Sequence, residues 1–216
     1  MTKLLQALNP HLESKTHVIW DFNGTLLNDV EHTVTTVNSL LAEHELPRIT
    51  SDDYKKIFDF PVVDYYIKLG FDFKKESFES LCDKFTTRFM GGFKEASGLM
   101  PDIELTLSLL KKQVGKQSIL SAAEQTSLLH IVDHHNISQH FDYIYGIDTH
   151  YADSKIARGK ELLKIANHPL NKTVIIGDTI HDLEVGEELG IDVILVAHGH
   201  QCSTRLKKHH DTVIEF

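Results

Sequence analysis

The hydrophobic pattern of the chain alternates between two kinds of segment. Short runs of β-branched and other apolar residues end in polar or glycine-bearing turns, which is typical of parallel strands buried on both faces. These runs cover residues 17–22, 117–121, 173–177 and 192–197. Two further runs, at residues 141–146 and 212–216, are expected to add another strand and an edge strand.

Amphipathic helical patterns lie between these runs. They cover residues 101–112, 126–136 and 156–166, with a shorter one at 182–189 that Gly190 closes. Strands that alternate with helices form a sheet whose two faces are both covered. We therefore predict the α/β class, with a doubly wound, Rossmann-like parallel sheet.

Residues 28–98 interrupt this alternation with helical patterns and no convincing strand. An apolar stripe runs along the first of these helices: Val30, Val34, Val37 and Leu41. Eight of the 11 phenylalanines fall in this segment, and we expect them to form the core of a small bundle, with one or two facing a ligand. The Gly91-Gly92 and Ser97-Gly98 pairs are expected to be the return hinge. The prediction is an α/β core of residues 1–27 and 99–216 with a helical domain inserted at 28–98.

Composition narrows the class of protein. A chain of 216 residues, 41 % apolar and 25 % charged, is typical of one globular core with an insertion. Its net charge of −9 argues against nucleic acid or an anionic membrane as a partner. With no apolar stretch of bilayer length and no secretory segment, the cytoplasm is the expected location. Cys82 and Cys202 each lack a second cysteine nearby, so reduced thiols are expected.

Polar residues that could carry chemistry follow the strand-like runs. The first run leads directly into Asp21-Phe22-Asn23-Gly24-Thr25-Leu26, at the strand end where open α/β sheets bind ligands. A carboxylate there can attack an electrophile, and the glycine-containing loop can direct backbone N–H groups at an anion. By itself such a turn is equally compatible with a structural role.

Three further strand-end features accompany this turn. Asp178 and Asp182 follow the third run, and two acids so placed repel each other unless a hard divalent cation lies between them; the alternative for Asp182 is a helix cap. Ser121 ends the second run, with Ala122 after it. Lys155 precedes Asp178 and could supply a fixed positive charge. A lone serine or lysine is by itself unremarkable.

Taken together, in this order, the four pieces resemble the signature motifs of the haloacid dehalogenase-like (HAD) hydrolase superfamily. The motifs are matched by residues 21–26, Ser121, Lys155 and residues 177–182. The inserted segment is similar to that superfamily's small helical cap. Its phrase Phe60-Pro61, followed by Tyr65-Tyr66 and Leu69-Gly70, resembles the caps of phosphoglycolate phosphatase-like members.

The resemblance implies a Mg²⁺-dependent phosphatase that acts on a small phosphorylated metabolite. Asp21 would attack phosphorus to form an aspartyl-phosphate, and Lys155 would orient it, with Lys160 the weaker candidate. The metal would be held by Asp21, by the main-chain carbonyl of Asn23 and by Asp178, with Asp182 ordering its shell. The phosphoryl oxygens would be held by Ser121, the N–H of Ala122, and N–H groups of the loop containing Phe22, Asn23, Gly24 and Thr25.

The chain departs from the phosphatase pattern at Asn23, where a second aspartate is usual. An amide cannot exchange a proton near neutral pH, so a general acid–base step worth about 10²–10⁴-fold loses its agent. The protein could be slow, use another acid or act on esters with good leaving groups, or the asparagine could be an engineered change. His181 is the preferred replacement acid, with His150 also near the expected site mouth.

The other histidines are expected at the surface. They include His44 in the inserted segment, and His198 and His200 after the last long strand. The spacing of His198, His200 and Cys202 superficially suggests a transition-metal site. It has no fourth ligand nearby, which disfavours a closed zinc site.

Two alternatives to a phosphatase remain. A degenerate member that binds a phosphorylated ligand or a partner without useful turnover is motivated by Asn23. A metal-free dehalogenase, which the superfamily also contains, is disfavoured because such a site gains nothing from Asp178 and Asp182.

Overall fold

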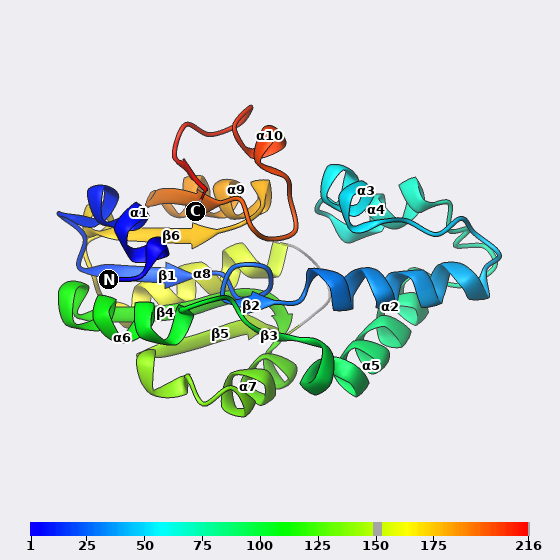
Figure 1. Cartoon of the computed structure of the whole chain (residues 1–216), viewed down its shortest axis with the longest axis horizontal. Coiled ribbons are helices and arrows are strands. Elements are labelled where there is room, and N and C mark those ends of the chain that lie inside the picture. The colour runs from blue at the N-terminus through cyan, green and yellow to red at the C-terminus, as the bar shows by residue number, and fades with distance from the viewer. Residues whose placement is uncertain (149–152, 216) are drawn as a thin grey trace.

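A six-stranded parallel sheet forms the centre of the computed structural model, which describes residues 1–148 and 153–215 (Figure 1). Its strand order is β5-β4-β1-β6-β7-β8, and every neighbouring pair is parallel. The strands are β1 (His17–Trp20), β4 (Lys116–Glu124), β5 (Tyr143–Ile147), β6 (Thr173–Gly177), β7 (Asp192–Val196) and β8 (Val213–Ile214). The predicted α/β class and parallel sheet are confirmed.

Helices cover both faces of this sheet. They are α1 (Lys3–Leu12), α6 (Ile103–Val114), α7 (Gln125–His134), α8 (Asp153–Ala166), α9 (Ile180–Leu189) and the short α10 (Ser203–Leu206). Val18 and Trp20 of β1 belong to one apolar cluster, which includes leucines of α1 and α6, whereas Ile19 belongs to another with Leu162 and Leu189. Because successive strand residues face opposite sides, these two clusters show that the sheet is buried on both.

Helix α1 was not predicted, although its sequence carries the signal. Leu4, Leu5, Leu8 and Leu12 are all buried in the larger cluster. This spacing is that of one helix face. Thr2 caps the helix by accepting a hydrogen bond from the N–H of Leu5.

The inserted segment consists of four helices: α2 (Val30–Glu43), α3 (Ser51–Ile57), α4 (Val62–Leu69) and α5 (Phe78–Ala96). They lie beyond the carboxyl ends of the strands (Figure 1). Where the chain leaves and re-enters the core, β2 (Leu27–Asn28) pairs antiparallel with β3 (Gly98–Leu99). We refer to α2–α5 as the cap.

The glycine pair predicted as a hinge has another role. Gly91 and Gly92 lie inside continuous helix α5, so the hinge prediction is wrong for them. A Cβ on Gly92 would lie 3.0 Å from the ring of His32 on α2, so this glycine permits close packing of the two helices. The chain turns instead at Ser97-Gly98, where α5 ends and β3 begins.

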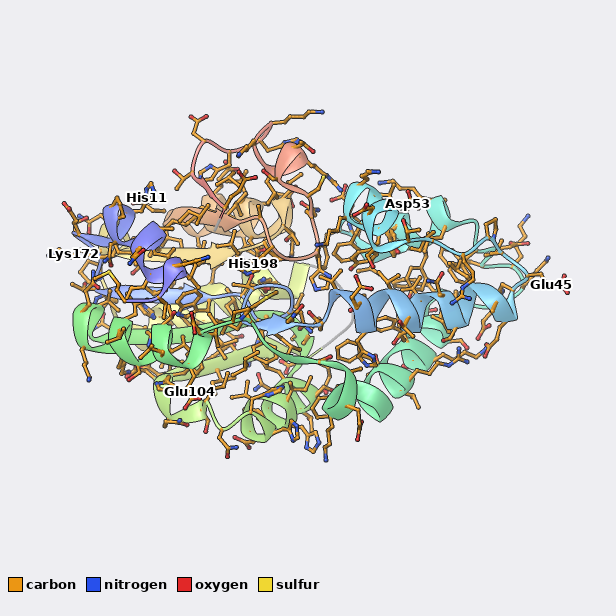
Figure 2. The ribbon with its side chains drawn as sticks, viewed as in Figure 1. His11, Glu45, Asp53, Glu104, Lys172 and His198 are labelled. Carbon is orange, nitrogen blue, oxygen red and sulfur yellow. The ribbon has the colours of Figure 1, made fainter. Side chains whose placement is uncertain are left out.

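Charged side chains such as Glu45 and Glu104 lie at the periphery (Figure 2), whereas His198 is half-buried. Its Nε2 is 3.1 Å from the carbonyl oxygen of Thr25, so this histidine has a partner in the loop that follows β1. None of the described helices has the length and apolar character needed to span a membrane.

Candidate active site

The predicted site residues converge because their strands are neighbours. Asp21 follows β1, Ser121 lies near the end of β4, and Asp178 follows β6. Strand β1 is hydrogen-bonded to β4 on one side and to β6 on the other. All three side chains are almost fully buried. The edge formed by these strand ends is where open α/β sheets bind ligands.

Lys155 links two of the buried carboxylates. Its Nζ lies 2.5 Å from Oδ1 of Asp21 and 2.7 Å from Oδ1 of Asp182. Burial raises the pKa of Asp21 to about 8, against the lowering effect of Lys155. For Asp182, burial is outweighed by Lys155, and the pKa lies below its usual range. Burial opposes the charge on Lys155, but the two carboxylates raise its pKa above the usual value. Lys160 is exposed on the same helix and does not take part.

Asp178 is held by groups from two separate loops. Oδ1 accepts a hydrogen bond from Thr25 Oγ1 at 2.8 Å, and Oδ2 accepts one from the backbone N–H of His200 at 2.5 Å. Burial raises its pKa to about 6. Gly24, at φ +74°, approaches so closely that a Cβ there would lie 2.4 Å from Asp178 Oδ2. A side chain at position 24 would therefore displace the carboxylate.

Three carboxylates form a cluster that suits a hard cation. Asp21, Asp178 and Asp182 each offer an oxygen, and these oxygens all lie within 4.8 Å of one another. Carboxylate oxygens are the ligands that Mg²⁺ prefers. Asp182 differs from the other two, because Oδ1 contacts Lys155 while Oδ2 accepts hydrogen bonds from the N–H and Oγ1 of Thr179. Both carboxylate oxygens of Asp182 therefore have partners within the chain. Such a residue is suited to positioning Lys155 and the neighbouring carboxylates.

Asn23 makes a contact that the sequence does not predict. Its side-chain Nδ2 donates a hydrogen bond to Oδ2 of Asp29 at 2.8 Å, and Oδ1 of Asp29 accepts another from the N–H of Gly24 at 2.9 Å. Asp29 stands at the N-cap position of α2, but its side chain makes no capping bond there. The side-chain amide of Asn23 therefore serves as a hydrogen-bond donor to the buried carboxylate of Asp29.

His200 completes this second network. Nε2 lies 3.2 Å from Oδ1 of Asp29, and Nδ1 lies 2.9 Å from the hydroxyl of Tyr54 on cap helix α3. Burial opposes the charge, but Asp29 raises the pKa of His200 to about 9. The expectation that His200 lies at the surface is wrong, since it is 6 % exposed. No local sequence signal marks it, because its partners come from distant segments.

The preferred histidine, His181, lies elsewhere. Its ring stacks on Phe60 at a centroid distance of 4.5 Å, and Nδ1 is 3.3 Å from Glu184. It is buried but does not line the cavity described below. His44 is also away from the site, 2.9 Å from Glu76, and His150 lies outside the described residues.

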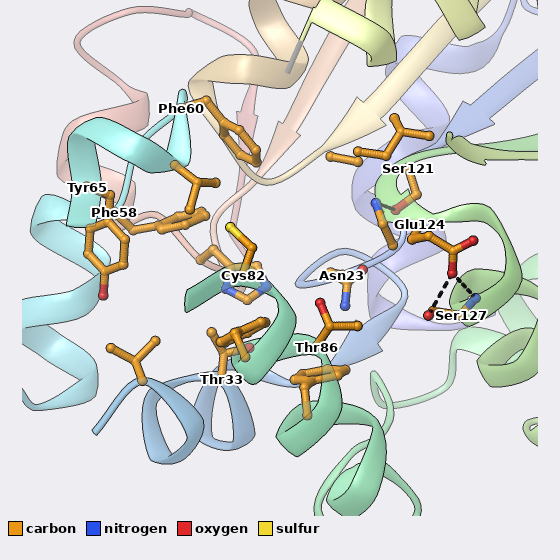
Figure 3. Close-up of a pocket in the computed structure, with 18 of the residues that line it drawn as sticks. Asn23, Thr33, Phe58, Phe60, Tyr65, Cys82, Thr86, Ser121, Glu124 and Ser127 are labelled. Atoms are coloured by element: carbon orange, nitrogen blue, oxygen red, sulfur yellow. Dashed lines mark hydrogen bonds between the residues drawn. The ribbon is translucent and has the colours of Figure 1, made fainter. Parts of the chain in front are cut away.

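A cavity of about 500 Å³ separates the core from the cap. On the core side it is lined by Asp21, Asn23, Ser121, Ala122 and Lys155. The hydroxyl of Ser121 accepts a hydrogen bond from the N–H of Ala123 at 3.0 Å, which fixes its orientation. Figure 3 shows Phe58, Phe60 and Tyr65 of the cap on one side of the pocket and Asn23 and Ser121 on the other. Thr25, Asp178 and Asp182 lie behind this lining, in contact with it or with each other.

Comparison with known proteins agrees with this geometry. Residues 18–196 match the model of the haloacid dehalogenase-like hydrolase family. The phosphoglycolate phosphatase of Aquifex aeolicus is 25 % identical over 185 residues, which cover 85 % of each chain.

Solved structures show the same fold. A haloacid dehalogenase-like family hydrolase from Streptococcus pneumoniae superposes with a TM-score of 0.79 at 18 % identity, over 93 % of each chain. A protein described as a predicted phosphatase from Clostridium acetobutylicum gives 0.79 at 18 % identity over 94 % of each chain. The chain therefore belongs to the haloacid dehalogenase-like hydrolase family, as an enzyme of the phosphatase type.

Proposed function

We propose that the protein is a Mg²⁺-dependent phosphomonoesterase in which Asp21 is the nucleophile. The observation that carries this proposal is the position of Asp21: its carboxylate lies at the floor of the cavity, fixed 2.5 Å from Lys155. A carboxylate held by a buried lysine stays oriented and shares its charge while a second anion approaches.

The reaction needs two displacements at phosphorus. A carboxylate oxygen of Asp21 forms a bond to phosphorus while the bond from phosphorus to the ester oxygen breaks, and the leaving oxygen keeps the electron pair. Water then attacks the phosphorus of the aspartyl-phosphate, which releases inorganic phosphate and restores Asp21. Lys155 keeps the carboxylate in place through both steps.

Backbone and side-chain donors surround the expected position of the phosphoryl group. Ser121, Ala122 and Asn23 line the cavity, and we assign the phosphoryl oxygens to the Ser121 hydroxyl, the N–H of Ala122 and the N–H groups of Phe22 and Asn23. Donors fixed before the reaction stabilise the charge that develops on the phosphoryl oxygens. Thr25 of this loop donates a hydrogen bond to Asp178, and Gly24 leaves room for the Asp178 carboxylate.

The carboxylate cluster fits a magnesium ion. Asp21, Asp178 and the main-chain carbonyl of Asn23 would hold it, with Asp182 ordering the ligands through Lys155 and Thr179. When bound, the ion supplies positive charge that offsets the repulsion between the nucleophile and the phosphate. In the protein alone, burial raises the pKa values of Asp21 and Asp178, and a bound cation would favour the charged forms of both carboxylates.

Asn23 favours a particular kind of ester. Its amide donates to Asp29 and carries no proton that it can give to a leaving oxygen. Esters whose leaving group departs as a stable anion need no such proton. The hydrogen bond from the Asn23 amide to Asp29 also supports a second candidate, because it holds in the site a residue that cannot act as an acid. This candidate is a protein that binds a phosphorylated ligand without turnover.

One experiment separates the two candidates. Phosphate release from phenyl phosphate is measured with Mg²⁺ and with EDTA, alongside thermal unfolding with phenylphosphonate, which cannot be hydrolysed. If the protein is a phosphatase, phosphate is released from phenyl phosphate with Mg²⁺ and EDTA stops this release. Stabilisation by the phosphonate without any release would favour the binding protein.

A further inference from the structure

The cap side of the cavity is apolar to an unexpected degree. Five of the eight cap-segment phenylalanines line it, where one or two were predicted: Phe58, Phe60, Phe78, Phe85 and Phe89. Val62, Val63 and Met90 add further apolar surface. Cavities of about 300–1,000 Å³ bury most of a ligand with one or more rings. The space of about 500 Å³ is therefore larger than a phosphate ester of two or three carbons needs.

Positive charge is scarce around this space. Among the described lining residues the cationic side chains are Lys155 and His200, and each is paired with buried carboxylates. Glu79 and Glu124 add negative charge at the lining. Tyr65 is buried on the cap side, and burial raises the pKa of its phenol, which keeps it neutral. A carboxylate on the substrate would find no unpaired cation among the lining residues that the structure describes.

We propose that the substrate is the phosphate monoester of a bulky, uncharged aromatic alcohol, with the ring seated among the cap helices. This inference rests on the proposed function. Two independent observations support it: the apolar, aromatic cap side offers surface suited to a ring, and the Asn23 amide cannot itself give a proton to the departing oxygen. An aryl oxide leaves as a stabilised anion and takes a proton from water after it has departed. The phosphoryl group is transferred first to Asp21 and then to water.

The size of the leaving group is tested with two esters of similar phenol acidity. We expect kcat/KM for 2-naphthyl phosphate to exceed that for phenyl phosphate by about 10-fold, because the cavity removes the second ring from water. Phosphoglycolate, with an alkyl leaving oxygen and a carboxylate, is expected at least about 100-fold below 2-naphthyl phosphate. Equal values for the two aryl esters, or a preference for phosphoglycolate, would overturn the inference.

Two adjacent threonines on α5 provide a matched pair of variants. Thr86 lines the cavity and lies between its two sides (Figure 3), whereas Thr87 is exposed. Thr86→Lys places a cation in the cavity and is expected to lower kcat/KM for 2-naphthyl phosphate about 10-fold while raising it for 4-carboxyphenyl phosphate. Thr87→Lys should change neither. An identical response of the two variants would contradict the placement of the ring.

A binding measurement separates this inference from the proposed function. Asp21→Asn, which cannot turn over, is titrated calorimetrically with both aryl phosphates in the presence of Mg²⁺. About 10-fold tighter binding of 2-naphthyl phosphate supports the inference even if the wild type releases no phosphate, in which case only the proposed function fails. Release of phosphate from phenyl phosphate without any advantage of the naphthyl ester refutes the inference alone. The same titration replaces kinetics if Thr86→Lys does not fold.

Discussion

The two sides of the cavity differ in how they are built and in what they specify. The core side is charged and comes from strand ends, where Lys155 lies within hydrogen-bond distance of Asp21 and Asp182. The cap side consists mainly of phenylalanines and aliphatic residues on helices. Charged groups must be placed to within fractions of an ångström to act on phosphorus, whereas apolar contact tolerates many arrangements. In the proposed function the core therefore sets the reaction and, through Asn23, the kind of leaving group, whereas the cap sets the size and polarity of the ester.

The largest expected effect removes the nucleophile. Asp21→Asn should lower kcat/KM for aryl phosphates by on the order of 10⁴-fold or more, because an amide does not attack phosphorus. The matched control is Asp133→Asn, at an exposed position on α7, which should leave the rate unchanged. Retention of more than about a tenth of the rate by Asp21→Asn would exclude it as the nucleophile.

Placing a carboxyl group at position 23 tests whether Asn23 limits proton transfer to the leaving oxygen. In Asn23→Asp the new carboxyl would lie against Asp29, and two adjacent carboxylates bind a proton more readily than one. We expect kcat/KM to rise by about 10²–10⁴-fold for alkyl phosphates and much less for aryl phosphates. Asn28→Asp, which adds the same charge at an exposed site, is the control. Equal gains for both ester classes would mean that proton transfer is not what Asn23 lacks.

The Lys155 network should also stabilise the fold. Lys155→Met leaves Asp21 and Asp182 buried without their cation, which should cost about 3–5 kcal/mol of unfolding free energy. Denaturant unfolding in EDTA measures this, and Lys160→Met, exposed on the same helix, should cost little. Similar losses of unfolding free energy in both variants would mean that the ion pairs of Lys155 do not stabilise the core side of the cavity.

His200, which joins the core to the cap through Tyr54, should make stability depend on pH. Its pKa is about 9 in the folded protein, held up by Asp29 against burial, and about 6.5 when unfolded. Between these values the folded state binds a proton that the unfolded state has lost, so stability decreases as pH rises. From pH 7 to 9 we expect the wild type to lose about 2 kcal/mol more unfolding free energy than His200→Gln. Parallel curves would show that His200 is not charged in the fold.

The core side could be predicted from the sequence to a much greater extent than the cap side. Polar residues directly after apolar runs, such as Asp21 and Asp178, must meet at one edge if the strands are parallel neighbours. The strand Thr173–Gly177 was predicted with both of its bounds correct. The buried leucines of α1 also follow a helical period, so the sequence carries a signal for this helix as well.

The cap side depends on information that no local pattern contains. Whether Phe58 faces the cavity or Phe71 packs inside the cap is decided by how four helices pack against one another. The burial of His200 depends on Tyr54 and Asp29, which are distant in sequence. Pairing between remote segments is a tertiary property, so hydrophobic periodicity does not reveal it.

A competition between two esters tests the central claim most directly. With 2-naphthyl phosphate and phosphoglycolate at equal concentrations and Mg²⁺ present, the initial ratio of released naphthol to glycolate equals the ratio of the two kcat/KM values. The account predicts a ratio of at least about 100 in favour of naphthol, because Asn23 cannot donate a proton to an alkyl leaving oxygen and the described residues of the cap lining include no unpaired cation. A ratio below one would contradict it, because the cavity would then select a small anionic ester despite its apolar cap side.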